Sequence, residues 1–239
     1  MRQFFALSLL VIFSTSCNYV FRKQIRGDGN IKTESRTAGQ FNSIDVSSSI
    51  EVYVKQDSVA SVKIEADENL MEYIQVIHDG EILRIHPEEG YNLRPSGHIK
   101  VYVSSPAYKS FEASGACNIY SENKISSTDM VNINLSGSCD AKLELSVPKV
   151  SADLSGACNI ELKGETKDFK VGGSGSTGIK SMDLLAENVD INLSGAGEAE
   201  VYASVKLNVE VSGAGSVKYK GNAAVSQSIS GAGSVKKVD

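Results

Sequence analysis

The chain has 239 residues and carries 24 basic against 29 acidic side chains, a formal net charge of −5 at pH 7. This length accommodates one long domain, and charges of mixed sign with an acidic excess argue against a nucleic-acid partner. Tryptophan is absent and aromatic residues make up 7% of the chain, which leaves few side chains for an aromatic sugar-binding platform.

The N-terminus reads as a secretory leader. Arg2 precedes an apolar run at residues 4–13, and three small residues, Ser14-Thr15-Ser16, lead to Cys17. The run is too short to span a bilayer. A cysteine directly after small residues resembles a bacterial lipoprotein signal, although Ser14 stands where such signals usually have leucine. We expect a signal peptide over residues 1–16 and lipid attachment at Cys17; an ordinary signal with an incidental cysteine is the alternative.

Residues 17–40 are interpreted as the lipidated cysteine, a tether and a first strand, and residues 41–110 as irregular β-rungs. Short apolar-alternating runs predict strands in this second part, at 44–46, 50–54, 62–64, 82–85 and 99–103. Residues 67–74 are the one plausible helical turn, and residues 86–98, with two prolines and two glycines, predict an exposed loop. Residues 46–49 look like a degenerate copy of the repeat described next, so this half is read as the atypical capping end of a solenoid.

A phrase of serine, glycine, a small residue and then usually cysteine or glycine recurs seven times in residues 111–239. The copies begin at Ser114, Ser136, Ser155, Ser174, Ser194, Ser212 and Ser230. Successive serines are 22, 19, 19, 20, 18 and 18 residues apart. A period in this range is typical of solenoids, in which each repeat packs on its neighbours.

Residues around each serine alternate between apolar and polar, which predicts strands with one buried face. The positions one before the serine are mostly apolar, including Leu135, Leu154, Leu193 and Val211, whereas those two before it are mostly polar, including Glu112, Asn134, Asp153 and Asn192. Glycine suits a sharp corner because it adopts positive φ at no steric cost. We predict an all-β, single-chain β-solenoid of the parallel β-helix type, right-handed, with rungs of about 18–22 residues and Ser-Gly turns.

The column six residues after the serine carries charges of alternating sign. It contains Lys142, Glu161, Lys180, Glu200 and Lys218. If these residues stack at the strand spacing of about 4.8 Å, each charge lies between two of opposite sign. Exposed pairs of this kind contribute at most about 1 kcal/mol each, so we interpret the column as a structural charge ladder.

Three cysteines occupy one slot of consecutive repeats, and Thr177 follows them in that slot. They are Cys117, Cys139 and Cys158. Free cysteine behaves as a small apolar residue, which favours a structural ladder of buried thiols. A disulfide between two of them stays open, because neighbouring rungs have suitable Cα spacing. A zinc site is disfavoured, because the three histidines all precede the repeats.

An enzyme is the less favoured alternative. A polysaccharide lyase or hydrolase needs an acid and a base close together, whereas Glu112, Asp153 and Glu210 are separated in their column by amides or glycine. The repeats contain no arginine or histidine, and their main aromatic residues are Tyr120, Tyr202 and Tyr219. The tripeptide Arg26-Gly27-Asp28 matches an integrin-binding motif, but three-residue matches are common by chance.

At residues 28–239 the chain resembles the putative auto-transporter adhesin, head GIN domain family of Bacteroidetes. The resemblance rests on the lipoprotein-like leader, on Phe41-Asn42-Ser43-Ile44, Ile50-Glu51-Val52-Tyr53 and Ala66-Asp67-Glu68-Asn69-Leu70, and on the repeated Ser-Gly rungs. It implies an all-β solenoid in the cell envelope and an adhesin role, without implying any site residue.

Two functional hypotheses follow. The first is a non-enzymatic adhesin or binding module on the outer membrane, tethered by lipid, which presents a rigid surface to polysaccharide, to protein or to another copy of itself. The second is a structural envelope lipoprotein without an external ligand. No cofactor is expected, and which side of the outer membrane the protein faces stays open. The final rung ends in Lys236-Lys237, which we expect either to protect an open strand edge or to lie in a self-association contact.

Overall fold

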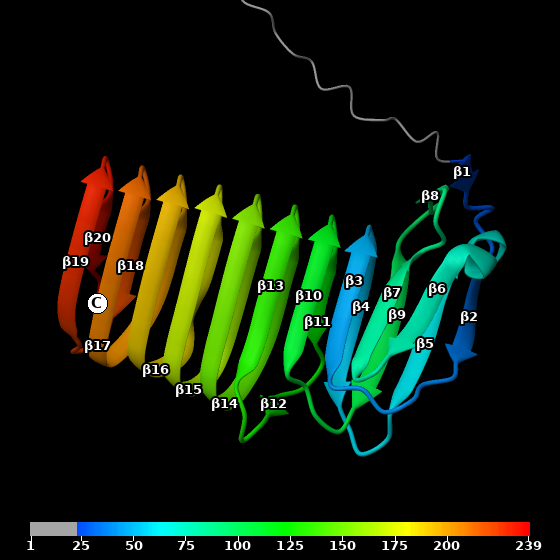
Figure 1. Ribbon diagram of the computed structural model, residues 1–239, viewed down its shortest axis with the longest axis horizontal. Coiled ribbons are helices and arrows are strands. Elements are labelled where there is room, and N and C mark those ends of the chain that lie inside the picture. The colour runs from blue at the N-terminus through cyan, green and yellow to red at the C-terminus, as the bar shows by residue number, and fades with distance from the viewer. Residues whose placement is uncertain (1–22) are drawn as a thin grey trace, which may run out of the picture.

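The computed structural model describes residues 23–239. Strands make up 72% of these residues and helix 3%, and the strands form a β-solenoid of about seven turns (Figure 1). The predicted all-β solenoid is therefore confirmed.

Four long strands, one to each rung, build the regular part of the solenoid. They are β14 (Asp140–Gly156), β15 (Asn159–Gly175), β16 (Gly178–Gly195) and β17 (Glu198–Gly213). Shorter strands flank them: β10 (Ser110–Gly115), β11 (Asn118–Ser121), β12 (Ile125–Ser126), β13 (Val131–Gly137), β18 (Ser216–Lys220), β19 (Ala224–Gly231) and β20 (Ser234–Lys237). Neighbouring rungs pair in parallel, so that Ser155 lies between Ser136 and Ser174. The Ser-Gly phrases consequently stack along one corner.

Each rung contributes to two sheets with different outer surfaces. The serine face consists of the strands that lead into the Ser-Gly turns: β3 (Ser43–Ser48), β10, β13, the second halves of β14–β17, and β19. The charged face consists of the strands that leave those turns: β4 (Ile50–Gln56), β11, the first halves of β14–β17, β18 and β20. Inward side chains of both sheets meet in one core, where Phe111, Ile119 and Leu193 have no exposed surface.

The turn glycines are required by backbone geometry. Gly137, Gly156 and Gly175 have φ values of 91°, 97° and 103°, a region that side chains disfavour. A Cβ atom on Gly156 would also lie 2.5 Å from the carbonyl oxygen of Gly137. That oxygen accepts a hydrogen bond from the Ala157 N–H at 2.7 Å, so it cannot move aside freely.

The degenerate copy predicted at residues 46–49 belongs to the same column. Ser47 and Ser48 pair in parallel with Ser114 and Gly115. Ser48 adopts φ 86° and is the one residue other than glycine with positive φ among residues 23–239. A serine therefore holds the backbone conformation that glycine has in the later turns.

Replacing Ser48 with glycine should stabilise the protein. The left-handed conformation costs a residue with a side chain about 1–2 kcal/mol, and glycine loses about 0.5–1 kcal/mol of this gain through greater freedom in the unfolded chain. We expect Ser48→Gly to raise the free energy of unfolding by up to about 1.5 kcal/mol, measured from the urea midpoint. Ser47→Gly is the matched control and should lower it; equal shifts for both variants would contradict the strain at Ser48.

The N-terminal end of the solenoid contains antiparallel strands. β5 (Ser61–Asp67) pairs antiparallel with β9 (Ile99–Ser105), and β2 (Ile31–Arg36) pairs antiparallel with β5. On the other sheet, β6 (Ile74–Asp79) pairs antiparallel with β7 (Ile82–Pro87). The helical turn predicted at 67–74 is confirmed as a 3₁₀ helix, η1 (Glu68–Tyr73).

The edge strand β2 carries charges on its inward side. Glu34 and Arg36 pair with the core residues Ile64 and Val62 of β5, and Arg36 Nε lies 2.8 Å from Glu34 Oε1 in an ion pair. Charges at such positions discourage strand addition at this edge.

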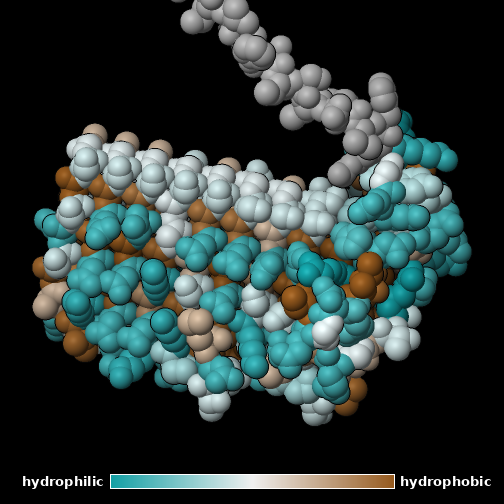
Figure 2. All heavy atoms as spheres, in the orientation of Figure 1, coloured by the Kyte–Doolittle hydropathy of each residue, from teal (hydrophilic) through white to brown (hydrophobic). Residues whose placement is uncertain are grey.

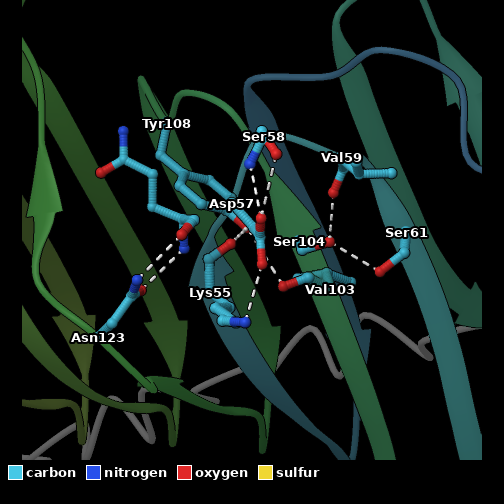
Figure 3. A network of polar contacts seen from close by, with 10 residues as sticks. Lys55, Asp57, Ser58, Val59, Ser61, Val103, Ser104, Tyr108 and Asn123 are labelled. Carbon is cyan, nitrogen blue, oxygen red and sulfur yellow. Dashed lines mark hydrogen bonds and ion pairs between the residues drawn. The ribbon is translucent and has the colours of Figure 1, made fainter.

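A polar network closes the corner that follows β4 (Figure 3). The hydroxyl group of the buried Tyr108 donates a hydrogen bond to the Lys55 carbonyl oxygen at 3.0 Å. Ser104 donates to the Val59 carbonyl oxygen at 2.6 Å, and Asn123 exchanges two hydrogen bonds with the Gln56 backbone. These contacts satisfy backbone groups where the chain leaves the regular ladder.

The prediction of an exposed loop over residues 86–98 is wrong in part. Tyr91–Arg94 forms β8, which pairs in parallel with β1 (Lys23–Arg26) as a separate two-stranded sheet. Leu93 is buried, and the Tyr91 ring lies 4.6 Å from the Tyr73 ring between centroids. These two alternate side chains hold the segment on the body of the protein despite its prolines and glycines.

Candidate functional site

The serine face presents small polar side chains over many rungs. Its middle outward column runs through Asp45, Glu112, Asn134, Asp153, Gly172, Asn192, Glu210 and Ser228. Serines of the repeated phrase form the column beside it. Figure 2 shows an upper row of near-neutral residues at the level where the strand arrows of Figure 1 end. Hydrophilic residues are gathered below this row. Short hydroxyl and amide side chains make this face suited to hydrogen bonding with an extended ligand.

A groove of about 790 Å³ crosses the serine face over β14–β17 and β19. Gly172 lies on its floor, and the missing side chain opens the column between Asp153 and Asn192. Lys170 and Asp190 line the same groove. The volume falls in the range of small-molecule sites, about 300–1,000 Å³.

The groove contains both satisfied and free polar groups. Asn208 donates to Asp190 at 2.6 Å and Asn192 donates to Glu210 at 3.4 Å. Asp153 and Lys170 make no side-chain hydrogen bond or ion pair within residues 23–239. These two side chains of opposite charge are thus available to a ligand.

The acidic residues weighed for catalysis lie on this face but not next to one another. Asn134 separates Glu112 from Asp153, and Gly172 and Asn192 separate Asp153 from Glu210 along the column. No two of these three carboxylates are therefore neighbours in the column, where the residue next to Glu112 on its other side is Asp45.

The five residues of the predicted charge ladder lie on consecutive rungs of the charged face. Lys142 pairs with Glu161 and Lys218 with Glu200, each at 3.0 Å, and these contacts raise the pKa of both lysines. Lys180 lies between Glu161 and Glu200 without an ion pair inside the described part of the chain. The five residues thus pair one above the other in the predicted order, while the stabilising role of the charge ladder stays a proposal.

A ladder of tyrosines extends the charged column toward the N-terminus, and sequence reasoning missed it. Tyr53 lies between Tyr102 and Tyr120, with ring centroids 5.0 and 5.3 Å apart, and Lys63 Nζ lies 4.7 Å from the centre of the Tyr102 ring. Burial and the hydrogen bond to Glu51 raise the pKa of Tyr53 to about 12. The ring faces contact one another rather than solvent, so this ladder is better suited to stabilising rungs than to stacking on a sugar. Tyr53 lies six residues after Ser47, and the charge-ladder residues lie six residues after their repeat serines. This shared spacing could have placed Tyr53 in the same column.

The three repeat cysteines are buried free thiols in adjacent rungs. Each Sγ donates to the carbonyl oxygen of the serine three residues earlier, at 3.2–3.3 Å. The hydrogen bond with Cys139, together with burial, raises the pKa of Cys117, and burial raises that of Cys158. Thr177 occupies the next slot, and its buried hydroxyl has no partner within residues 23–239. No group of metal-binding side chains occurs in that range.

The Arg26-Gly27-Asp28 tripeptide is held against η1. Asn69 accepts from the Asp28 N–H at 3.0 Å and donates to the Arg26 carbonyl oxygen at 2.7 Å. A Cβ atom on Gly27 would collide with the carboxylate of Asp67. The backbone of the tripeptide therefore forms part of the N-terminal fold, while the side chains of Arg26 and Asp28 are exposed.

Asp67 fastens this segment, and its replacement should loosen the N-terminal end. Its buried carboxylate accepts hydrogen bonds from the Gly29 N–H and from the Ser96 N–H and hydroxyl, at 2.8, 3.0 and 2.6 Å. Burial raises the pKa, but these hydrogen bonds outweigh it and lower the pKa below the ordinary 3.8. The ionised Asp67 carboxylate therefore stabilises the folded state fully above about pH 4. This contribution to the free energy of unfolding is lost as the pH falls through the lowered pKa of the folded protein.

We expect Asp67→Asn to cost about 2 kcal/mol, because an amide NH₂ then faces a donor. Urea unfolding at pH 7, with amide exchange at Gly29 and Ser96, measures the effect. Asp28→Asn is the control, since Asp28 is exposed and should change stability little. Unchanged amide exchange in the Asp67 variant would contradict the fastening role.

Cys17 and the predicted leader lie outside the described residues. In the range that the structure describes, no helix is long and apolar enough to cross a membrane.

Comparison with known proteins gives matches over most of the chain. The family model described as putative auto-transporter adhesin, head GIN domain, matches residues 40–223. A putative adhesin from Bacteroides fragilis is 22% identical, with a TM-score of 0.84 over 90% of this chain and 100% of that one. A putative lipid binding protein from Parabacteroides distasonis is 27% identical, with a TM-score of 0.73 over 91% and 100%. A putative adhesin from Parabacteroides merdae is 23% identical, with a TM-score of 0.70 over 91% and 100%. A search of curated proteins finds no match.

Proposed function

Because this chain belongs to the putative auto-transporter adhesin, head GIN domain family, we propose that it is a non-enzymatic adhesive module of the cell envelope. Lipid at Cys17 would anchor it to the outer membrane, and the solenoid would present its serine face to a polar polymer, a polysaccharide or a protein. The naming of similar Bacteroidetes structures as adhesins supports an envelope location.

The observation that carries this proposal is the groove on the serine face. It is open and lined by hydroxyl, amide and charged side chains, and it spans several rungs of a rigid ladder. A surface preorganised by continuous strand pairing binds an extended ligand with little further ordering. The unpaired Asp153 and Lys170 supply charges that could orient such a ligand.

Three alternatives are less well supported. An envelope scaffold without an external ligand would leave the groove unexplained. A polysaccharide-cleaving enzyme would need an acid and base arrangement that the separated column of Glu112, Asp153 and Glu210 does not supply. Lipid binding, after which the similar structure from Parabacteroides distasonis is named, would not use the carboxylate and ammonium groups that line the groove beside its apolar residues.

Protease shaving of intact cells, with antibody detection of the repeats, tests this proposal. We expect external protease to digest the wild-type solenoid, and Cys17→Ala to release the protein from the membrane fraction. Binding to arrays of glycans and matrix proteins should then fall when Lys170→Glu reverses the free charge in the groove. Protection until the outer membrane is broken would contradict adhesion and favour a periplasmic scaffold.

A further inference from the structure

The corner opposite the Ser-Gly turns is uneven because the rungs differ in length. The rung that follows Ser114 has 22 residues, the next two have 19, and the rung that follows Ser174 has 20. The serine face stays in register throughout, so extra residues must bulge at the opposite corner. The extra residue of the rung after Ser174 appears as a register shift between Glu161 and Lys163 on the preceding rung. Further shifts, between Ser181 and Leu185 and between Ala186 and Asn188, accompany the change to the 18-residue rung that follows Ser194. Two shorter rungs thus lie between two longer ones.

A hollow of about 540 Å³ occupies this step, and we call it the corner hollow. Its lining comes from five rungs: Ser127 on one side, Pro148 and Glu165 between, and Leu185 and Tyr202 on the other side. Bulges that redirect side chains are common beside functional sites. The hollow is shallow and open to solvent, with room for one or two rings of a small ligand on its surface.

The hollow combines apolar and polar groups. Leu185 is 55% exposed and stands opposite Tyr202 in the register. Glu165, between the two sides of the hollow, accepts a hydrogen bond from the Ser146 hydroxyl at 2.8 Å. Lys167 and Glu187 add charged groups to the lining. An exposed leucine beside a tyrosine ring is unfavourable in water and suits the C–H face of a ligand, whereas the carboxylates and the ammonium suit its hydroxyl groups.

The wall at Ser127 is held by hydrogen bonds. The Gln56 side chain donates to the Ser126 carbonyl oxygen at 2.9 Å and accepts from the Ser126 N–H at 2.7 Å. Asn123 is bound to the Gln56 backbone (Figure 3), and the Ser127 N–H donates to the Ser146 carbonyl oxygen at 3.3 Å. This wall is therefore in place before any ligand binds, which lowers the ordering cost of binding.

We infer that the corner hollow is a second binding site, which takes a pyranose unit of a saccharide chain. A pyranose ring has an apolar C–H face and a rim of hydroxyl groups, the two surfaces that Leu185 with Tyr202 and Glu165 with Lys167 complement. The inference does not depend on the serine-face groove, which lies on a different set of side chains.

The test uses the full chain on an array of hexose, N-acetylhexosamine and uronic-acid oligosaccharides, with phospholipid vesicles as a separate arm. We expect oligosaccharide binding that Leu185→Ser weakens roughly tenfold, the equivalent of about 1.4 kcal/mol. Val205→Ser is the matched control, because Val205 is 56% exposed at the same corner but does not line the hollow, and it should change binding less than twofold.

Several outcomes would overturn the inference. Absence of saccharide binding, equal binding by the Leu185 variant and the wild type, or binding to vesicles alone would each do so. If Lys170→Glu abolished array binding while Leu185→Ser did not, the corner hollow would be overturned and the proposed adhesive function would stand. If only Leu185→Ser weakened binding, the saccharide site would stand and the serine-face groove would lose its support.

Discussion

Leu193→Asp should lower the free energy of unfolding by about 4 kcal/mol or more. Leu193 has no exposed surface, and its methyl groups fill space beside Gly173, Gly197 and Gly215 that those glycines leave empty. A carboxylate there would be buried without a charged partner. The Thr177 hydroxyl, which also approaches Gly173 and Gly197, could donate one hydrogen bond, too little to offset the loss of hydration.

Asn192→Asp is the matched control for this substitution, one residue away on the exposed side of the strand. Its cost should stay within about 0.5 kcal/mol, since the side chain reaches solvent even though Glu210 is near. Urea denaturation of the two variants and the wild type measures the difference. Comparable destabilisation by both would contradict the division of the strand into buried and exposed columns.

Gly156→Ala should lower the free energy of unfolding by about 2–4 kcal/mol. The positive φ costs an alanine about 1–2 kcal/mol, and its Cβ atom would press on the Gly137 carbonyl oxygen. Relieving this contact requires the two rungs to separate, which weakens the hydrogen bond from the Ala157 N–H.

Gly172→Ala is the control for the turn substitution. Gly172 has no positive φ, and the nearest obstacle to a Cβ atom is Asp153 Oδ1 at 2.9 Å, the end of a side chain that can rotate. Stability should change by less than about 0.5 kcal/mol. Thermal and urea unfolding of both variants measures the effects, and equal losses would argue against a special role for the turn glycines.

The repeats made the regular rungs predictable. Alternation around each serine identified the buried columns, and the spacing of the phrases identified the solenoid, because neighbouring rungs must present matching residues to one another. The same alignment placed Lys142, Glu161 and the other charges in a single column. The degenerate copy at Ser47 even located the strand that pairs with β10.

The N-terminal half and the candidate site were less accessible to sequence reasoning. Alternation reports which side of a strand is buried but not its direction, so the antiparallel pairing of β2, β5 and β9 could not be inferred. Tyr102 joins the tyrosine ladder from a strand without a Ser-Gly phrase. The groove depends on a missing side chain at Gly172 together with side chains from β14–β17 and β19, and no single rung contains that arrangement.

The small sheet of β1 and β8 sets how the protein would respond to mechanical load. Under the proposed anchoring at Cys17 and binding of an external ligand, a pulling force would enter the described part of the chain at Lys23, in this sheet. β1 and β8 share four residue pairs, whereas β14 and β15 pair along nearly their whole length. The pairing of β1 with β8 should therefore separate at a lower force than the pairing within the regular rungs. Separation would release β1 and leave the two outer faces of the solenoid undeformed.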